Sequence, residues 1–361
     1  MNPRGLITYG AVFLLTLALP GCGAFSYYSQ AIGGHLDLMS RRVSIDQLIA
    51  ASETPPALKR KLHLVTGARD FASDDLSLPE NDSYRSYAEL GREYAVWNVF
   101  AVPELSLKPV SSCFVWIGCL SYRGFFNVAD AEAFANELRA AGHDVFVAGV
   151  AAYSTLGWFD DPVLNTMLVW DDNRIVEVIF HELAHQLLYA DDDTAFNEGF
   201  ATAVAQIGAE RWDSRDPQIR KRYLKSDARE KEFYAMLLVY RGKLEGVFSN
   251  EETDSVKREA KSRLYSELLV RYNELKRSWN GYTGYDAWMS TDLNNAKIAS
   301  VATYHEYVPV FRFILDTVDG NLERFYAIAK ELAAMTPEQR ERCFGLPGGE
   351  SECLNEVLVG Q

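Results

Sequence analysis

The sequence predicts an α+β fold that is mainly helical, with a small mixed sheet and a long charged helical hairpin. The residue composition changes near residue 93. The segments EYAVWNVFAV and SCFVWIGCLSYRGFF are rich in aromatic and β-branched residues, which are typical of strands. An amphipathic helix over 130–141 then leads into the strand DVFVAGVAAY. The charged stretch 218–279 carries apolar residues at helical intervals on both sides of SNEETDS. A strand-helix-strand order inside a mainly helical chain indicates the α+β class.

These patterns divide the 361-residue chain into five regions. They are a signal peptide of the lipoprotein type (1–21), an N-terminal helical region (22–92), a core with the sheet and two central helices (93–212), the charged helical hairpin (213–280) and a C-terminal helical region expected to complete the active site (281–361). The 48% content of hydrophobic residues excludes wholesale disorder.

The amino terminus has the features of an export signal. An apolar run of about 14 residues, short for a bilayer-spanning helix, ends at Leu19-Pro20-Gly21-Cys22. This end looks like a bacterial lipobox, which implies cleavage before Cys22 and a lipid on that cysteine. Because Gly23 is not the aspartate of inner-membrane retention, we expect a protein anchored in the bacterial cell envelope, on the outer membrane and facing the periplasm. A cleaved soluble secretory protein and a short membrane anchor are the alternatives.

Four cysteines remain when Cys22 is set aside, and an even number in an oxidising compartment predicts disulfides. They are Cys113, Cys119, Cys343 and Cys353. Three pairings are possible. The pairing of Cys113 with Cys119 and of Cys343 with Cys353 requires the least chain closure.

The charge of the chain limits its partners. The formal net charge is -14, whereas nucleic-acid binding requires a basic surface. We therefore expect no nucleic-acid partner.

The stretch HELAHQLLYADDDTAFNEGFA, from His181 to Ala201, concentrates histidines in a chain that has six. Residues four apart on a helix share one face, so His181 and His185 can present their rings to one ion. Glu182 projects beside them and can reach a water molecule held by the metal, which is the role of a general base. The alternative is an ordinary buried helix, in which two histidines and a glutamate would be costly without partners.

A catalytic zinc ion takes three protein ligands and leaves one position for water. The metzincin continuation, a glycine and then a histidine, is absent after His185. Instead NEGFA places Glu198 thirteen residues beyond His185. Asp193 or Thr194 can cap a second helix, whose first turn then directs Glu198 back toward the histidines. His181, His185 and Glu198 are therefore the predicted ligands of one Zn²⁺ ion.

HELAHQ followed by NEGFA resembles the gluzincin metallopeptidases, particularly the zinc aminopeptidases. More of the chain resembles a bacterial family of predicted aminopeptidases, which are zincin-like lipoproteins. The similar stretches are VWNVFAVPE, CLSYRGFF, AYSTLGWFDDPVL, IFHELAHQLLY and NNAKIASVATYHEYVP. The resemblance implies a zincin-like metallopeptidase fold, a peptide or protein substrate, Glu182 as catalytic residue and a downstream tyrosine, Tyr304 in preference to Tyr307, as oxyanion donor.

The resemblance has gaps that leave the reaction open. The GxMEN segment that binds the substrate amine in large zinc aminopeptidases is missing, and the spacer before Glu198 is shorter. Asp160 or Asp161 could bind that amine, or could simply form a turn before Pro162. A zinc endopeptidase and a non-catalytic envelope lipoprotein with a structural metal site are the alternatives to an aminopeptidase.

Overall fold

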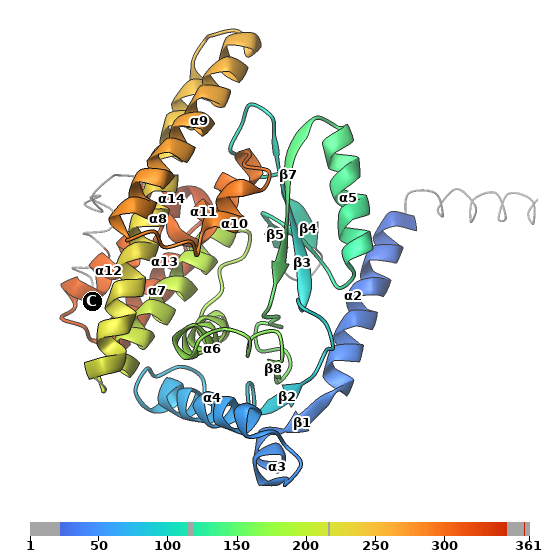
Figure 1. Cartoon of the computed structure of the whole chain (residues 1–361), viewed down its shortest axis with the longest axis vertical. Helices are drawn as coiled ribbons and strands as arrows, with labels where there is room; N and C mark the ends of the chain where they lie inside the picture. Colours follow the sequence, from blue (N-terminus) through green and yellow to red (C-terminus); the bar gives the residue numbers. More distant parts are fainter. Residues whose placement is uncertain (1–21, 115–117, 216, 345–356, 358–361) are drawn as a thin grey trace, which may run out of the picture.

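The computed structural model describes residues 22–114, 118–215, 217–344 and 357 (Figure 1). The described helices are α2 (Cys22–Ser40), α3 (Ile45–Ala50), α4 (Pro56–Asp74), α5 (Val128–Ala140), α6 (Asp172–Leu187), α7 (Thr194–Asp213), α8 (Pro217–Ser249), α9 (Asp254–Ser278), α10 (Asp286–Ser290), α11 (Asn295–His305), α12 (Val308–Thr317), α13 (Leu322–Ala333) and α14 (Pro337–Phe344). The described strands are β1 (Arg42–Ser44), β2 (Ser86–Ala88), β3 (Val96–Pro103), β4 (Ser112–Phe114), β5 (Gly118–Leu120), β6 (Arg123–Phe125), β7 (His143–Val150) and β8 (Val163–Leu164). Many helices with small sheets confirm the predicted α+β class.

The strands of the described residues form three small sheets. In one, β3 pairs antiparallel with both β6 and β7. In the second, β2 pairs antiparallel with β1 and parallel with β8. The third is the hairpin of β4 and β5. The strand-helix-strand order predicted around residues 130–141 is the β6-α5-β7 unit, in which α5 packs on β3 and β7.

The region 22–92, expected to be helical, also contains strands β1 and β2. These strands are three residues long, which is too short to show an alternating pattern. They form because β2 meets β8, which lies far away in the sequence. The mixed sheet therefore consists of β1 and β2 of this region with β8, to the right of α4 in Figure 1, and does not lie in the 93–125 segment.

Helices α8 and α9 form the predicted charged hairpin, which projects from the body of the molecule (Figure 1). The apolar side chains between them make a separate core that includes Phe233, Leu237, Leu244 and Leu268. Helix α8 also contacts α7 and α11, and its residues Asp227, Glu230 and Tyr234 line a large cavity.

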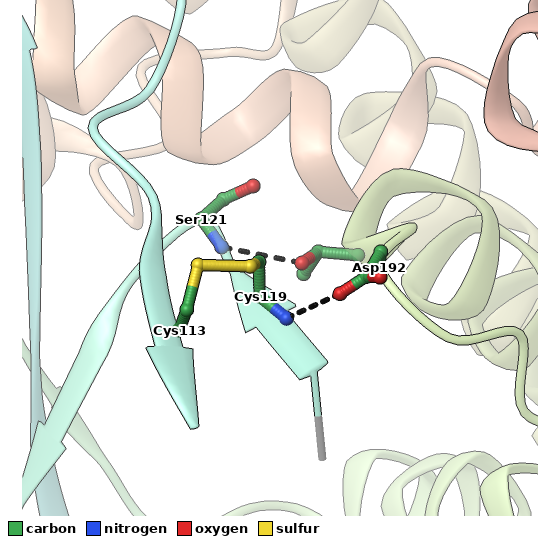
Figure 2. The surroundings of a disulfide bond; sticks show 5 residues. Cys113, Cys119, Ser121 and Asp192 are labelled. Carbon is green, nitrogen blue, oxygen red and sulfur yellow. Dashed lines mark hydrogen bonds between the residues drawn. A yellow bond between two sulfur atoms is a disulfide. The ribbon is translucent and has the colours of Figure 1, made fainter. Parts of the chain in front are cut away.

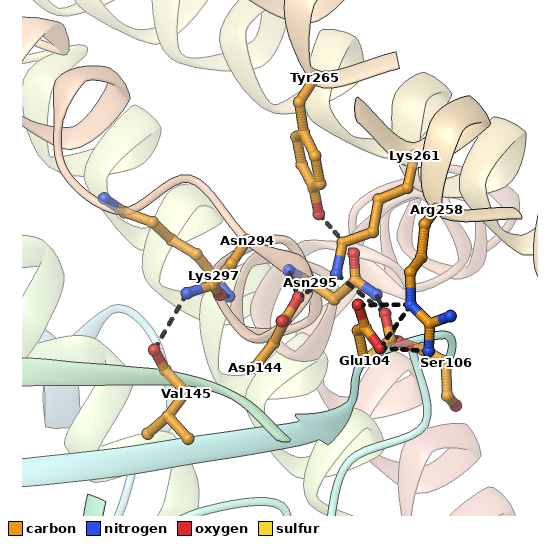
Figure 3. Close-up of polar contacts among 10 residues, drawn as sticks. All are labelled: Glu104, Ser106, Asp144, Val145, Arg258, Lys261, Tyr265, Asn294, Asn295 and Lys297. Carbon is orange, nitrogen blue, oxygen red and sulfur yellow. Dashed lines mark hydrogen bonds and ion pairs between the residues drawn. The ribbon is translucent and has the colours of Figure 1, made fainter. Parts of the chain in front are cut away.

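A polar network fastens the hairpin to the sheet (Figure 3). Lys261 of α9 lies 2.7 Å from the carboxylate of Asp144 at the start of β7, and the same carboxylate accepts a bond from the backbone of Asn295. The Asn295 side chain donates to the carbonyl of Glu104 at 2.8 Å, and Arg258 pairs with the Glu104 carboxylate. This network fixes the first turn of α11 against the end of β3.

The main core surrounds α6 and α7, which pack against each other. Aromatic residues from α7, α12 and α13 stack within it, among them Phe200, Phe311 and Phe325. The predicted signal peptide lies outside the described residues. Within the described part of the chain, no helix combines the length and the apolar character needed to cross a membrane.

Candidate metal centre

Helix α6 carries the first two predicted ligands. It begins where the side chain of Asp171 accepts a hydrogen bond from the backbone of Arg174. The carboxylate of the next residue, Asp172, pairs with Lys61 of α4 at 2.8 Å. This pair ties the start of α6 to α4, and His185 lies three turns further along the buried helix.

Helix α7 carries the third predicted ligand. Asp193 caps it by accepting a bond from the backbone of Phe196, as the sequence predicts. The connection before it is fixed by Asn197, whose amide bonds both the N–H and the carbonyl of Ala190 at 2.7 Å. Arg340 of α14 also pairs with Asp193. These contacts hold Glu198 in the first turns of α7, facing α6.

A disulfide supports the same connection from outside (Figure 2). Cys113 and Cys119 are bonded, which confirms one of the predicted pairs. The backbone of Cys119 donates to the Asp192 side chain at 2.6 Å, and that of Ser121 donates to Thr194 at 3.2 Å. The β4-β5 hairpin is thereby attached to the α6-α7 loop.

The second predicted pair is only partly visible. Cys343 is disulfide-bonded, but Cys353 lies outside the described residues, so their pairing stays a prediction.

His181, His185 and Glu198 come together as one group that could hold a metal ion. Nε2 of His181 lies 3.1 Å from Oε2 of Glu198 and 3.2 Å from Nε2 of His185, and Nε2 of His185 lies 3.5 Å from the same oxygen. Ligand atoms about 2.0–2.1 Å from a tetrahedral ion are roughly 3.3 Å apart. The three donor atoms therefore match one face of a zinc coordination tetrahedron.

The charge state of the group also suits a metal. Burial alone would raise the pKa of Glu198, but its hydrogen bonds to His181 and His185 outweigh this effect and lower the pKa to about 2. The carboxylate is therefore ionised, as a metal ligand must be.

Glu182 and Tyr304 line the same cavity of about 970 Å³ as the three ligands. The Glu182 carboxylate has no hydrogen bond or ion pair with another described residue, so it is free to bind a water molecule. The rings of Tyr304 and His181 are stacked 6.3 Å apart. Burial, together with the charges of Glu198 and Glu182, raises the pKa of Tyr304 well above its ordinary value. Its hydroxyl group therefore stays protonated and can donate a hydrogen bond.

Asp160 and Asp161 do not line this cavity. Asp161 is completely buried, and its carboxylate accepts bonds from the backbone and the hydroxyl of Thr155 at 2.7 and 2.9 Å. Asp160 accepts a bond from Arg42 through its backbone carbonyl. Both residues lie between the turn at 155–158 and Pro162.

Sequence reasoning missed Tyr122, whose hydroxyl lies 3.5 Å from Oε1 of Glu198. It immediately precedes β6, and the pairing of β6 with β3 brings it to the ligand. The similar stretch CLSYRGFF contains it, but the stretch alone gives no sign of that contact.

A charged group lines the cavity near the start of α6. Glu177 lies one turn before His181 on the same helix face and 3.3 Å from Arg174. Glu230 of α8 joins them. Burial raises the pKa of Glu177 to about 7, and the nearby charge of Glu230 adds to the effect while Arg174 opposes it.

A comparison with known protein families gives a match. A family model described as "Putative aminopeptidase" matches residues 26–344, from α2 to the end of α14. No curated protein and no solved structure matches the chain. Because the family model covers most of the sequence, the chain belongs to the putative aminopeptidase family.

Proposed function

We propose that this protein is a zinc-dependent aminopeptidase. The observation that carries the proposal is the group formed by His181, His185 and Glu198, whose donor atoms have the mutual spacing of zinc ligands and lie in a large cavity next to Glu182. Two imidazoles with one carboxylate make a catalytic ligand set, because they leave a position open.

Zinc held by these residues would supply Lewis-acid activation of water and of the substrate carbonyl. Glu182 accepts the proton of the attacking water and passes it to the leaving amine, as a general base and then a general acid. Tyr304 donates a hydrogen bond to the oxyanion that develops on the carbonyl oxygen.

An aminopeptidase also needs a negative group for the substrate's α-ammonium. Asp160 and Asp161 lie outside the cavity, but it is lined by Glu177, one turn before His181 on α6, and by Glu230 of α8. Burial raises the pKa of Glu177 to about 7 and also raises the pKa of Glu230, so a substrate cation bound beside them would favour their ionised forms. These two residues therefore support cleavage at a free amino terminus.

The proposed substrates are short peptides or the amino-terminal segment of an envelope protein. The proposed location is the bacterial envelope, with a lipid on Cys22 and the catalytic body facing the periplasm. Helix α2 begins at Cys22, so this lipid would sit at the start of the folded body.

The first experiment compares Glu182→Gln with Glu137→Gln, a change at an exposed glutamate on α5. We expect Glu182→Gln to bind zinc like the wild type but to lose peptide hydrolysis by about 10²–10⁴-fold. We expect Glu137→Gln to change neither property. Turnover by Glu182→Gln at the wild-type rate would exclude the proposed mechanism.

A second experiment separates an aminopeptidase from an endopeptidase. One peptide is supplied with a free and with an acetylated amino terminus, and the products are identified by mass spectrometry. We expect release of the first residue from the free peptide only. Equal cleavage of both peptides would identify an endopeptidase.

A further inference from the structure

One face of the β6-β3-β7 sheet forms a wall of the cavity that holds the metal group. From β3 the cavity is lined by Val96, Asn98 and Phe100, and from β7 by Val150, Ala148 and Phe146. Alternate residues of a strand point to the same face, and the register pairs these two sets one to one. The cavity therefore runs along the sheet.

The two faces of this sheet differ in their cover. The opposite face packs on α5 through Val99, Ala101 and Val145 (Figure 1). On the cavity face, α11 covers only one end, where Ala296 and Ala299 contact Phe100. The rest of this apolar face stays open to the cavity.

Asn98 lies in the middle of the open face. It is 6% exposed, and its side chain makes no hydrogen bond with any residue in the described ranges. Its neighbours across the sheet are Gly124 and Ala148. A β-carbon at Gly124 would lie 3.1 Å from the Asn98 oxygen, so the glycine leaves room for the amide. The amide lines the cavity and is not among the buried polar groups that lack a partner, so a molecule in the cavity can reach its donor and its acceptor.

Ring contacts connect this face to the metal group. The Tyr122 hydroxyl lies 3.5 Å from Glu198, the Tyr122 ring lies 5.2 Å from Phe100, and Phe100 lies 6.3 Å from Phe146. Asn98 is two residues beyond Phe100, or roughly 7 Å along the strand. An extended peptide covers this distance in about two residues.

The cavity has an apolar rim of exposed side chains. It is formed by Ile32 and Leu36 of α2 with Trp158 and Phe159, which are 58%, 60%, 71% and 53% exposed. Exposed apolar side chains that gather at the mouth of a cavity indicate a binding surface.

We propose that the open sheet face is a subsite for an extended peptide with apolar side chains, in which the Asn98 amide bonds a peptide group of the substrate. The assignment rests on the proposed function in one respect, which is that the peptide reaching the metal group is the substrate. Apolar walls with one placed polar group are typical of pockets that select a ligand by shape and by a single hydrogen bond.

Binding is measured by calorimetry on the zinc-loaded Glu182→Gln protein, which cannot consume the ligand. The probes are Ala-Leu-Phe-Leu-Gly and Ala-Ser-Asn-Ser-Gly. We expect the apolar peptide to bind at least about tenfold more tightly, because burial of one large apolar side chain has an effect of that size. Equal affinities would overturn the proposal.

The role of Asn98 is tested by replacing each peptide bond of the apolar probe with an ester in turn. One ester should weaken binding by about 3–10-fold. The Asn98→Ala variant should bind the unmodified probe with the same reduced affinity. On this variant, the ester that weakens binding to the parent protein should cause no further loss of affinity. Additive losses at every position would show that Asn98 does not bond the peptide.

The rim is tested with a matched pair of helix positions. Ile32 and Val270 are 58% and 59% exposed, but only Ile32 lines the cavity. We expect Ile32→Glu to weaken binding of the apolar probe by about tenfold and Val270→Glu to leave it unchanged. Equal effects of the two changes would overturn the assignment of the rim.

These outcomes separate the two proposals. If the wild-type protein hydrolyses no peptide but the binding results hold, the proposed function fails and the apolar subsite stands. If hydrolysis occurs but both probes bind alike and Asn98→Ala has no effect, the enzyme stands and the subsite fails.

Discussion

The hydroxyl of Tyr122 lies 3.5 Å from Oε1 of Glu198, whereas the other carboxylate oxygen, Oε2, faces His181. The two residues are separated by 76 positions in the sequence. The contact joins the sheet with its apolar face to the helices that hold the metal group.

This contact predicts the effect of Tyr122→Phe. Loss of a hydrogen bond to a ligand carboxylate should weaken zinc binding by about tenfold, as for other groups that orient metal ligands. Competition with a chelator measures the affinity. The control is Tyr272→Phe, which removes a hydroxyl that bonds Asp286 in the hairpin. If both variants hold zinc like the wild type, the Tyr122 contact has no role in metal binding.

Tyr304→Phe should affect the reaction more than substrate binding. If its hydroxyl stabilises the oxyanion, kcat should fall by about 10²–10³-fold with little change in KM. Steady-state kinetics with a free-amino peptide measures both constants. A rise in KM at unchanged kcat would instead show that Tyr304 contributes only to binding.

Glu177 predicts a pH-dependent stability difference. Its folded-state pKa of about 7 exceeds the ordinary 4.5, so the folded chain binds this proton more tightly than the unfolded chain. Stability from this group is therefore present below pH 4.5 and is lost as the pH rises through 7. Glutamine does not titrate, so the Glu177→Gln variant does not lose this stability. The free energy of unfolding of the variant minus that of the wild type should therefore rise by about 1–3 kcal/mol from pH 4 to pH 8.

Urea unfolding at both pH values tests this prediction. The control is Glu274→Gln, because Glu274 pairs with Arg271 at the same spacing as Glu177 with Arg174 but is 48% exposed. We expect the control to show no comparable change with pH. If the difference in free energy of unfolding between Glu177→Gln and wild type is the same at both pH values, burial does not raise the pKa of Glu177.

The bond between Cys113 and Cys119 should stabilise the loop that precedes α7. Replacing both cysteines with serine should lower the free energy of unfolding by about 2 kcal/mol, the value expected for a short closed loop. It should also weaken zinc binding, because the Cys119 backbone bonds Asp192 beside the ligand helix. Urea unfolding and chelator competition measure the two effects, and an unchanged midpoint together with unchanged affinity would show that the hairpin is independent of the site.

The predicted metal ligands depend on local sequence. His181 and His185 are four residues apart on one helix, and a short capped turn brings Glu198 back to them, so spacing and capping rules suffice. The charged hairpin is predictable for a similar reason, because its helical periodicity continues over many turns.

The residues that sequence reasoning missed depend on distant pairings. Tyr122 and Asn98 reach the cavity only because β6 and β7 both pair with β3. The Asp172 carboxylate binds Lys61 of α4, which leaves the cap of α6 to Asp171. Asp161 is buried and bonded to Thr155 and does not line the cavity, and the pattern of acidic residues before Pro162 does not show this.

The most direct test of the account is the metal content of the purified protein and of its ligand variants. We predict one zinc ion per chain in the wild type, retained in Glu182→Gln and lost in His185→Ala and Glu198→Ala, with each variant checked for folding by circular dichroism. A folded wild-type protein that takes up no zinc, or a Glu198→Ala variant that retains it, would contradict the account.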